Sequence, residues 1–183
     1  MIRIDQTRFG LIEVEDDTLI RFPNGVIGFP NETGFVLLER GEGRMVSYLQ
    51  SVTTPGLAFP VIDGSYFGEY PDPPVETLAK SAGLTEGDYA MMVIVAVRND
   101  TKALEANLLA PLIINVAKRR GAQVVLDPRK YSAQTSLADP IGMAKARMEA
   151  MRQARESQDD PEEADPARFE RTPSQAPPVV AGP

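Results

Sequence analysis

The 183-residue sequence contains no cysteine, no histidine and no tryptophan. Without cysteine the chain can form no disulfide bond and offers no thiolate, which fits a reducing compartment. Without histidine it lacks the commonest general base and the commonest metal ligand of proteins. We therefore expect no catalytic residue, no cofactor and no metal ion, and a chain that is not an enzyme.

Long hydrophobic runs are absent as well. The first residues alternate instead of forming a basic segment followed by an apolar one, and no run approaches the roughly 20 apolar residues of a membrane-spanning helix. Positive charge is in the minority: the chain has 19 Lys and Arg but 26 Asp and Glu, which gives a net charge of −7. This balance disfavours direct contact with nucleic acid and suits a basic protein partner. We expect a cytoplasmic protein that binds neither membrane nor nucleic acid.

The apolar residues, 43% of the chain, concentrate between residues 89 and 126. Short apolar runs rich in β-branched residues and separated by turn-like segments are typical of strands, and their nearly continuous apolarity indicates burial on both faces. The three runs therefore predict a central sheet, most simply an antiparallel meander, over residues 89–97, 107–116 and 123–126.

The preceding residues add shorter elements of the same kind. The pattern predicts a two-stranded ribbon over residues 2–14, a helix over residues 75–81 that stops at Gly83, and further strands. Pro60 cannot donate to a ladder, which places its strand at a sheet edge. The fold class is therefore mostly β: a small antiparallel β-barrel-like or sandwich domain with one short helix. The further strands are expected at residues 19–22, 35–38, 45–50 and 57–62.

The composition changes near Leu137. Pro140 could begin a helix that reaches about Glu156, with apolar residues on one narrow stripe. Beyond it the chain is acidic, rich in proline and almost free of large apolar residues, which predicts disorder. We expect a domain over residues 1–137, a possible helix over 138–157 and a disordered tail over 158–183.

Two other classes of protein are compatible with this composition. A hydrolase could use carboxylates and a serine, and Lys80 or Lys102 could activate a serine without histidine, although no motif supports it. A small β-barrel could also bind a small ligand in an apolar cavity. A solved structure with a filled interior would count against both. The serines concerned are Ser47, Ser51 and Ser65.

Residues 63–74 hold the best candidates for a binding site. Three aromatic residues give rigid contact area in a loop, and neighbouring carboxylates add charge for a basic partner. An alternative is that the rings cap the open end of the barrel. The candidate partner-binding residues are Asp63, Tyr66, Phe67, Glu69, Tyr70 and Asp72.

Three consecutive basic residues follow the second run of the predicted central sheet. Lys118, Arg119 and Arg120 lie where a hairpin tip is expected. They could touch an acidic partner, or they could form an ordinary solvated turn.

Four segments carry motifs that can be compared with known families. They are Phe22–Phe29, Phe35–Leu38 with Tyr48–Ser51, Asn107–Asn115, and Gly121–Leu126 with Tyr131. In this order they resemble the flagellar assembly factor family, FliW, whose patterns are F-x-x-G-[ILV]-x-G-F, an F-x-L-L-like strand followed by L-Q-S, N-L-x-A-P-[IL]-[IV]-[IV]-N, and G-x-Q-[VI]-[VI]-L with a following tyrosine. The resemblance extends over residues 1 to about 137.

The resemblance implies a β-barrel-like regulator that is not an enzyme. Proteins of this family bind the translational repressor CsrA, prevent it from silencing flagellin mRNA, and also bind flagellin. Flagellin that accumulates in the cytoplasm occupies the family protein, and export of flagellin frees the protein to antagonise CsrA. We expect this chain to work by such a partner switch, with flagellin contributing an amphipathic helix laid into an apolar groove.

Overall fold

The computed structural model describes residues 1–39, 45–68, 70–98, 103–137, 149 and 152. The chain divides into one compact unit over Met1–Met148 and a second over Glu149–Pro183. In the second unit the described residues are Glu149 and Arg152, both helical and exposed. The helix predicted over 138–157 and the tail predicted over 158–183 otherwise lie outside the described residues, so these assignments and the domain boundary at residue 137 remain predictions.

The described part of the first unit is mostly β, as predicted. It holds eleven strands, one α-helix and two 3₁₀ turns. In chain order they are β1 (Ile2–Thr7), β2 (Gly10–Val14), η1 (Asp16–Thr18), β3 (Ile20–Arg21), β4 (Gly34–Leu38), β5 (Val46–Ser51), β6 (Ala58–Asp63), η2 (Gly64–Phe67), α1 (Val75–Ser81), β7 (Tyr89–Val97), β8 (Leu104–Ala106), β9 (Leu112–Asn115), β10 (Arg120–Gln123) and β11 (Thr135–Leu137).

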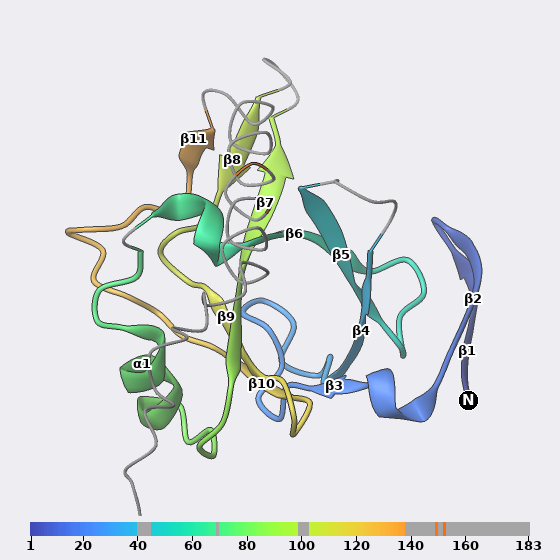
Figure 1. The fold of residues 1–183 in the computed structure, drawn as a ribbon. Coiled ribbons are helices and arrows are strands. Elements are labelled where there is room, and N and C mark those ends of the chain that lie inside the picture. The colour runs from blue at the N-terminus through green and yellow to red at the C-terminus, as the bar shows by residue number, and fades with distance from the viewer. Residues whose placement is uncertain (40–44, 69, 99–102, 138–148, 150–151, 153–183) are drawn as a thin grey trace, which may run out of the picture. The chain divides into compact units, whose positions relative to one another are not determined.

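The main sheet closes on itself (Figure 1). Its strand order is β11-β8-β7-β6-β5-β4-β3-β10-β9, and an additional pairing joins β9 to β7. The strands from β7 through β9 therefore form a closed ring, which is the barrel that the sequence predicts. Ring closure depends on the long strand β7, whose residues 89–92 pair with β9 and whose residues 95–97 pair with β8. β11 and β8 extend the sheet beyond the ring.

The central sheet differs from the predicted meander in two respects. The run over residues 107–116 is not one strand, because the Asn107 side chain accepts a hydrogen bond from the Ala110 amide at 3.1 Å and Pro111 has no N–H to continue a ladder. Only β9 remains of it. The third strand is β10, at residues 120–123 instead of 123–126, because the hairpin turn ends at Arg119, which has a φ of 49°.

Two expectations about strand direction and edges were also wrong. The sheet contains one parallel pair, β3 with β10, which aligns Arg21 with Arg120 and closes the ring. Pro60 does not lie on an edge strand, since β6 has β5 on one side and β7 on the other. The β6–β7 pairing runs from Val61 to Asp63 and so leaves Pro60 outside it.

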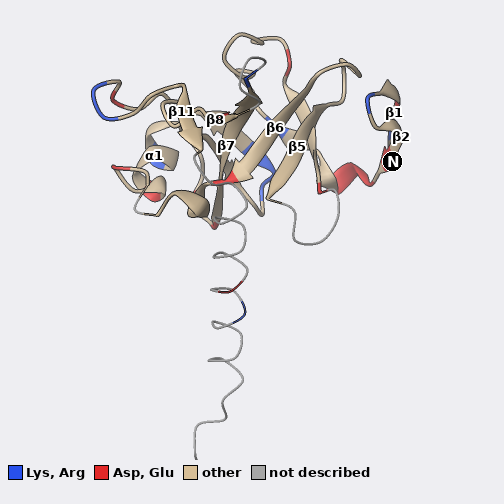
Figure 2. Cartoon of the chain, turned by 90° about the horizontal axis from the view of Figure 1, so that it is seen from above, with Lys and Arg blue, Asp and Glu red and all other residues tan. Residues whose placement is uncertain are grey.

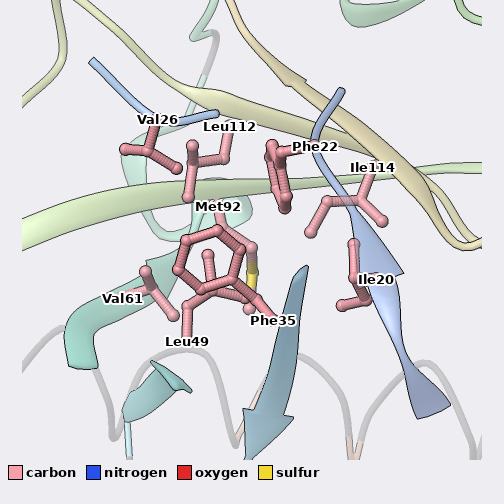
Figure 3. Packing of buried hydrophobic residues seen from close by; sticks show 9 residues of the cluster. All are labelled: Ile20, Phe22, Val26, Phe35, Leu49, Val61, Met92, Leu112 and Ile114. Carbon is pink, nitrogen blue, oxygen red and sulfur yellow. The ribbon is translucent and has the colours of Figure 1, made fainter. Parts of the chain in front are cut away.

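The interior of the ring is filled with apolar side chains, shown in Figure 3. Phe22 and Phe35 meet edge to face with ring centroids 5.6 Å apart, and both are fully buried. Burying side chains of this size stabilises the fold by about 1.5–3 kcal/mol each. This filled interior counts against a small-ligand cavity inside the barrel. The cluster consists of Ile20, Phe22, Val26, Phe35, Leu49, Val61, Met92, Leu112 and Ile114.

Three further clusters cover the outside of the ring. The β1–β2 ribbon, correctly predicted, packs Ile4 and Ile12 against Val36. Helix α1 packs Leu78 and Ala79 against a patch that includes Ile113 of β9. The third cluster lies over β6, β7, β8 and β11. Among the described residues no helix is long and apolar enough to cross a membrane.

Candidate partner-binding surfaces

The predicted binding residues lie in the segment that leaves β6, residues 63–68 and 70–74, called here the aromatic segment. Asp63 ends β6, and its carboxylate accepts a hydrogen bond from the Ser65 amide at 2.8 Å, which holds the start of η2. The Asp63 side chain is exposed. Glu69 lies outside the described residues.

The three rings of the aromatic segment are half-buried and pack on the barrel. Tyr66 and Phe67 contact the cluster that contains Ile62 and Val95. Tyr70 lies 6.0 Å from Phe67 and 5.2 Å from Tyr131, centroid to centroid. The structure therefore brings the rings together and gives all three a packing role on the outside of the ring; their role in binding remains a prediction.

Polar contacts fix the far end of the same segment. The Tyr70 hydroxyl donates to the Leu108 carbonyl at 2.9 Å, and burial raises the pKa of this hydroxyl well above its ordinary range. The Asp72 amide donates to the Tyr131 hydroxyl at 3.0 Å, and the Asp72 carboxylate pairs with Lys130 at 2.7 Å. These contacts could not be predicted from local sequence patterns, because Lys130 and Tyr131 lie some sixty positions further along the chain.

A surface cleft of about 500 Å³ opens beside the aromatic segment. Its lining includes the exposed Asp63 and the first three residues of β7, Tyr89, Ala90 and Met91. It combines apolar lining with few polar groups, as in concave binding sites in general. The lining residues are Asp63, Ser65, Gly68, Tyr70, Pro71, Pro74, Val75, Tyr89, Ala90 and Met91.

A second surface surrounds residues 23–30, called here the glycine loop. Gly25 has a φ of 67°, and a Cβ there would lie 2.4 Å from the Phe29 carbonyl oxygen. Only glycine fits this turn. The Ile27 amide donates to Gln123 Oε1 at 2.7 Å, and Gln123 in turn donates to the Ala110 carbonyl at 2.9 Å. The backbone of the loop is thus anchored to β10.

This anchoring leaves apolar side chains of the glycine loop in solvent. The side chain of Ile27 is 58% exposed and that of Phe29 is 41% exposed, although the Phe29 ring meets Phe59 of β6 at 5.3 Å. A depression of about 310 Å³ lies between the loop and β10. In the sequence, the signal for this exposure is the position of Ile27 between Gly25 and Gly28, both of which adopt positive φ in the structure.

The serine hydrolase alternative finds no support at Ser51, the serine closest to a carboxylate. Its hydroxyl donates to Glu32 at 2.5 Å, and the side chain is fully buried. Hydrogen bonds from Ser51, Thr53 and Thr54 hold the pKa of Glu32 below its usual range, which makes the carboxylate a weak base. This group orders the turn after β5. Among the described residues, no group of three or more acidic side chains could hold a metal ion.

These features define a small β-barrel domain with two candidate surfaces, the glycine loop and the cleft beside the aromatic segment, called here the acidic cleft because Asp63 lies in its wall. Comparison with known proteins places the domain in a family. A family model for the FliW protein matches residues 3–137. The chain belongs to the FliW family.

Similar proteins support this assignment over most of the length of each chain. A flagellar assembly factor FliW of Heliobacterium modesticaldum is 38% identical over 138 residues, which cover 74% of this chain and 90% of the relative. A FliW of Geobacillus thermodenitrificans is 39% identical over 130 residues, 70% of this chain and 90% of the relative. A crystal structure of the flagellar assembly factor FliW superposes with a TM-score of 0.63 at 35% identity, covering 73% of this chain and 95% of that one. The resemblance found in the sequence is thereby confirmed.

Proposed function

We propose that this chain is a flagellar assembly regulator of the cytoplasm, not an enzyme, that binds the translational repressor CsrA and thereby relieves repression of flagellin synthesis. It also binds flagellin, and the two partners exclude each other. Membership of the FliW family over residues 3–137 carries this proposal. The filled barrel interior and the two accessible surfaces support a protein that acts by binding other proteins.

The acidic cleft suits the repressor. An RNA-binding protein carries basic surface, and a partner with a net charge of −7 attracts it at long range. Asp63 and Asp72 place exposed carboxylates at the two ends of the aromatic segment. We assign the repressor to this surface, with the predicted set Asp63, Tyr66, Phe67, Glu69, Tyr70 and Asp72 as its contact region.

The glycine loop suits flagellin. An amphipathic helix binds by laying apolar residues into a groove. Ile27 and Phe29 are exposed next to the depression of about 310 Å³, so an apolar helix face would cover side chains that are otherwise in water. We therefore assign the flagellin helix to the glycine loop.

The positions of the two surfaces explain why the partners would exclude each other. The glycine loop contacts Phe59 near the start of β6, and the aromatic segment begins at Asp63, where β6 ends. Four residues of strand span about 13 Å. A standard interface covers about 800 Å² per partner, which corresponds to a patch about 16 Å in radius. Two such patches centred on the ends of β6 overlap, so bound flagellin blocks the repressor by occupying space.

Titration calorimetry with purified CsrA from the same organism, with and without flagellin, tests the partner switch. We expect binding of CsrA that saturating flagellin suppresses. Binding of CsrA that flagellin leaves unchanged would contradict mutual exclusion. The absence of heat with either protein from a folded sample would contradict the function as a whole.

A pair of double variants tests the assignment of the acidic cleft. Asp63→Asn/Asp72→Asn removes two charges, and asparagine at position 63 keeps a carbonyl oxygen that can accept from the Ser65 amide. Asp16→Asn/Asp17→Asn removes the same charge from η1, the acidic turn next to the β1–β2 ribbon (Figure 2). We expect the first variant to weaken CsrA binding about tenfold, about 1.4 kcal/mol, and the second less than twofold. Equal losses would remove the cleft as the repressor site.

A further inference from the structure

The described cationic side chains fall into two groups. Seven of the eleven have an ion pair, a ring contact or another interaction within the chain. Among the described residues four cations have none, and the four are neighbours in space although one comes from a distant part of the sequence. We call them the basic cluster: Arg21, Lys118, Arg119 and Arg120.

The parallel pair of β3 and β10 assembles the basic cluster. Arg21 is the register partner of Arg120, and the Arg21 amide donates to the Arg119 carbonyl at 2.8 Å. The next residues along each strand, Phe22 and Gly121, face the barrel interior, where a Cβ on Gly121 would lie 2.5 Å from the Phe22 ring. Since side chains alternate along a strand, Arg21 and Arg120 both face outward.

The hairpin that carries the other two cations is rigidly held. The buried Asn115 accepts a hydrogen bond from the Lys118 amide at 2.8 Å and donates to the Thr85 carbonyl at 2.8 Å. All four cationic side chains are exposed, and Val116, 44% exposed, adds an apolar contact at the base of the turn. The surface is therefore fixed by backbone contacts before any ligand arrives.

Like charges placed opposite each other on paired strands destabilise a sheet. Here the cost is not offset within the described part of the chain, although acidic residues outnumber basic ones by 26 to 19. A ligand that brings negative charge would remove this repulsion and gain charge-assisted hydrogen bonds to arginine. The arrangement therefore points to an acidic occupant.

We propose that the basic cluster is a second interaction surface of this chain, which binds an acidic segment of a partner protein. A protein segment fits better than a nucleic acid for two reasons. The net charge of −7 repels a polyanion at long range, and no aromatic side chain lies among the cluster residues to stack on bases. This surface is opposite in sign to the acidic cleft, so a basic protein that binds the cleft is repelled here. The inference rests on geometry and charge and does not depend on the proposed function.

Fluorescence anisotropy tests the proposal with a labelled peptide that alternates Glu with Val. The neutral comparison is the same peptide with Gln for Glu. We expect the full chain to bind the Glu peptide and not the Gln peptide at about 50 mM salt, and binding to weaken strongly towards about 200 mM. Failure of the Glu peptide to bind at low salt would overturn the proposal.

Charge-matched variants locate the binding. Arg21→Gln/Arg120→Gln removes two charges from the basic cluster and keeps the backbone bond of Arg21. Arg3→Gln/Arg129→Gln removes two charges from exposed arginines that already pair with Glu13 and Asp127. We expect the cluster variant to lose at least about tenfold in affinity for the Glu peptide and the control variant less than about twofold. Equal losses would show that binding follows net charge alone and would overturn the proposal.

A labelled oligouridine of the same charge separates the two classes of anionic partner. We expect it to bind more weakly than the Glu peptide. Tighter binding of the oligouridine that is lost in Arg21→Gln/Arg120→Gln would replace the acidic protein segment with a nucleic acid. Circular dichroism and urea unfolding of each double variant establish that the comparison is made between folded proteins.

Discussion

The glycine loop and the aromatic segment flank the two ends of β6, and they are built in opposite ways. In the glycine loop the backbone carries the structure, through positive φ at Gly25 and the bond from the Ile27 amide to Gln123. Ile27 and Phe29 are therefore left exposed, whereas Val26 is buried in the barrel interior. In the aromatic segment the side chains carry the structure, because Phe67 and Tyr70 pack together and Tyr70 holds the Leu108 carbonyl. There the carboxylates of Asp63 and Asp72 remain exposed, although each makes one local contact, to the Ser65 amide and to Lys130 respectively. In each region the exposed groups are the ones available to a partner.

The largest effect is expected from adding one methyl group to the glycine loop. Gly25→Ala would place a Cβ against the backbone of Phe29 and Pro30 at a positive φ, so we expect a loss of about 3 kcal/mol in the free energy of unfolding. Gly28→Ala is the matched control, because its φ of 86° is also positive but a Cβ there meets nothing within 4 Å. We expect a loss of about 1 kcal/mol from it in urea unfolding. Equal losses would show that strain alone, without the clash, decides the turn.

The next effect concerns the ring that anchors the aromatic segment. Tyr70→Ala removes a half-buried ring and should lower the free energy of unfolding by about 2 kcal/mol. Tyr70→Phe removes only the bond to Leu108 and should cost about 1 kcal/mol. Tyr89→Phe, which loses an exposed bond to the Thr85 carbonyl, should change stability by less than about 0.5 kcal/mol. A stable Tyr70→Ala variant would mean that the ring serves binding and not packing.

A smaller and pH-dependent effect is expected at Glu32, which follows the glycine loop. Its folded-state pKa lies below the unfolded value, so the carboxylate favours folding above about pH 4.3 and this contribution is lost as the pH falls through the folded-state pKa. Glu32→Gln should therefore be less stable than the unmodified chain at pH 7. The difference should shrink in thermal unfolding below about pH 4. A difference that stays constant with pH would contradict a role for the ionised carboxylate.

The smallest effect on folding is expected from the exposed apolar residue of the glycine loop. Ile27→Ser should change the free energy of unfolding by less than about 0.5 kcal/mol, because the side chain is 58% exposed, yet it should weaken flagellin binding. Leu11→Ser on the β1–β2 ribbon replaces a side chain that is 48% exposed and serves as the control for binding. A loss of flagellin binding in both variants, or in neither, would break the contrast between the two regions.

Much of the barrel could be predicted from local sequence patterns. The ribbon, the β4–β5 hairpin, helix α1 and the full length of β7 follow from periodicity, turn residues and apolar runs, which are properties of neighbouring residues. The prediction was wrong at the parallel pairing of Arg21 and at Pro60, which lies in an internal strand, because pairing between distant segments decides both. The split of the 107–116 run has a local cause, the Asn107–Ala110 hydrogen bond and the missing N–H of Pro111, which the continuous apolar pattern does not indicate.

For the candidate surfaces, too, some properties follow from the sequence and others only from the tertiary structure. The sequence by itself determined that the chain is acidic, lacks histidine and cysteine, and carries aromatic residues near position 66. The sequence also placed the chain in its family through four short segments. Only the tertiary structure decided that Tyr70 is held by Leu108, that Ile27 and Phe29 are exposed, and that Arg21 joins Lys118, Arg119 and Arg120. The physical reason is that composition and periodicity act between neighbours in the chain, whereas closing a ring of strands brings together residues about one hundred positions apart.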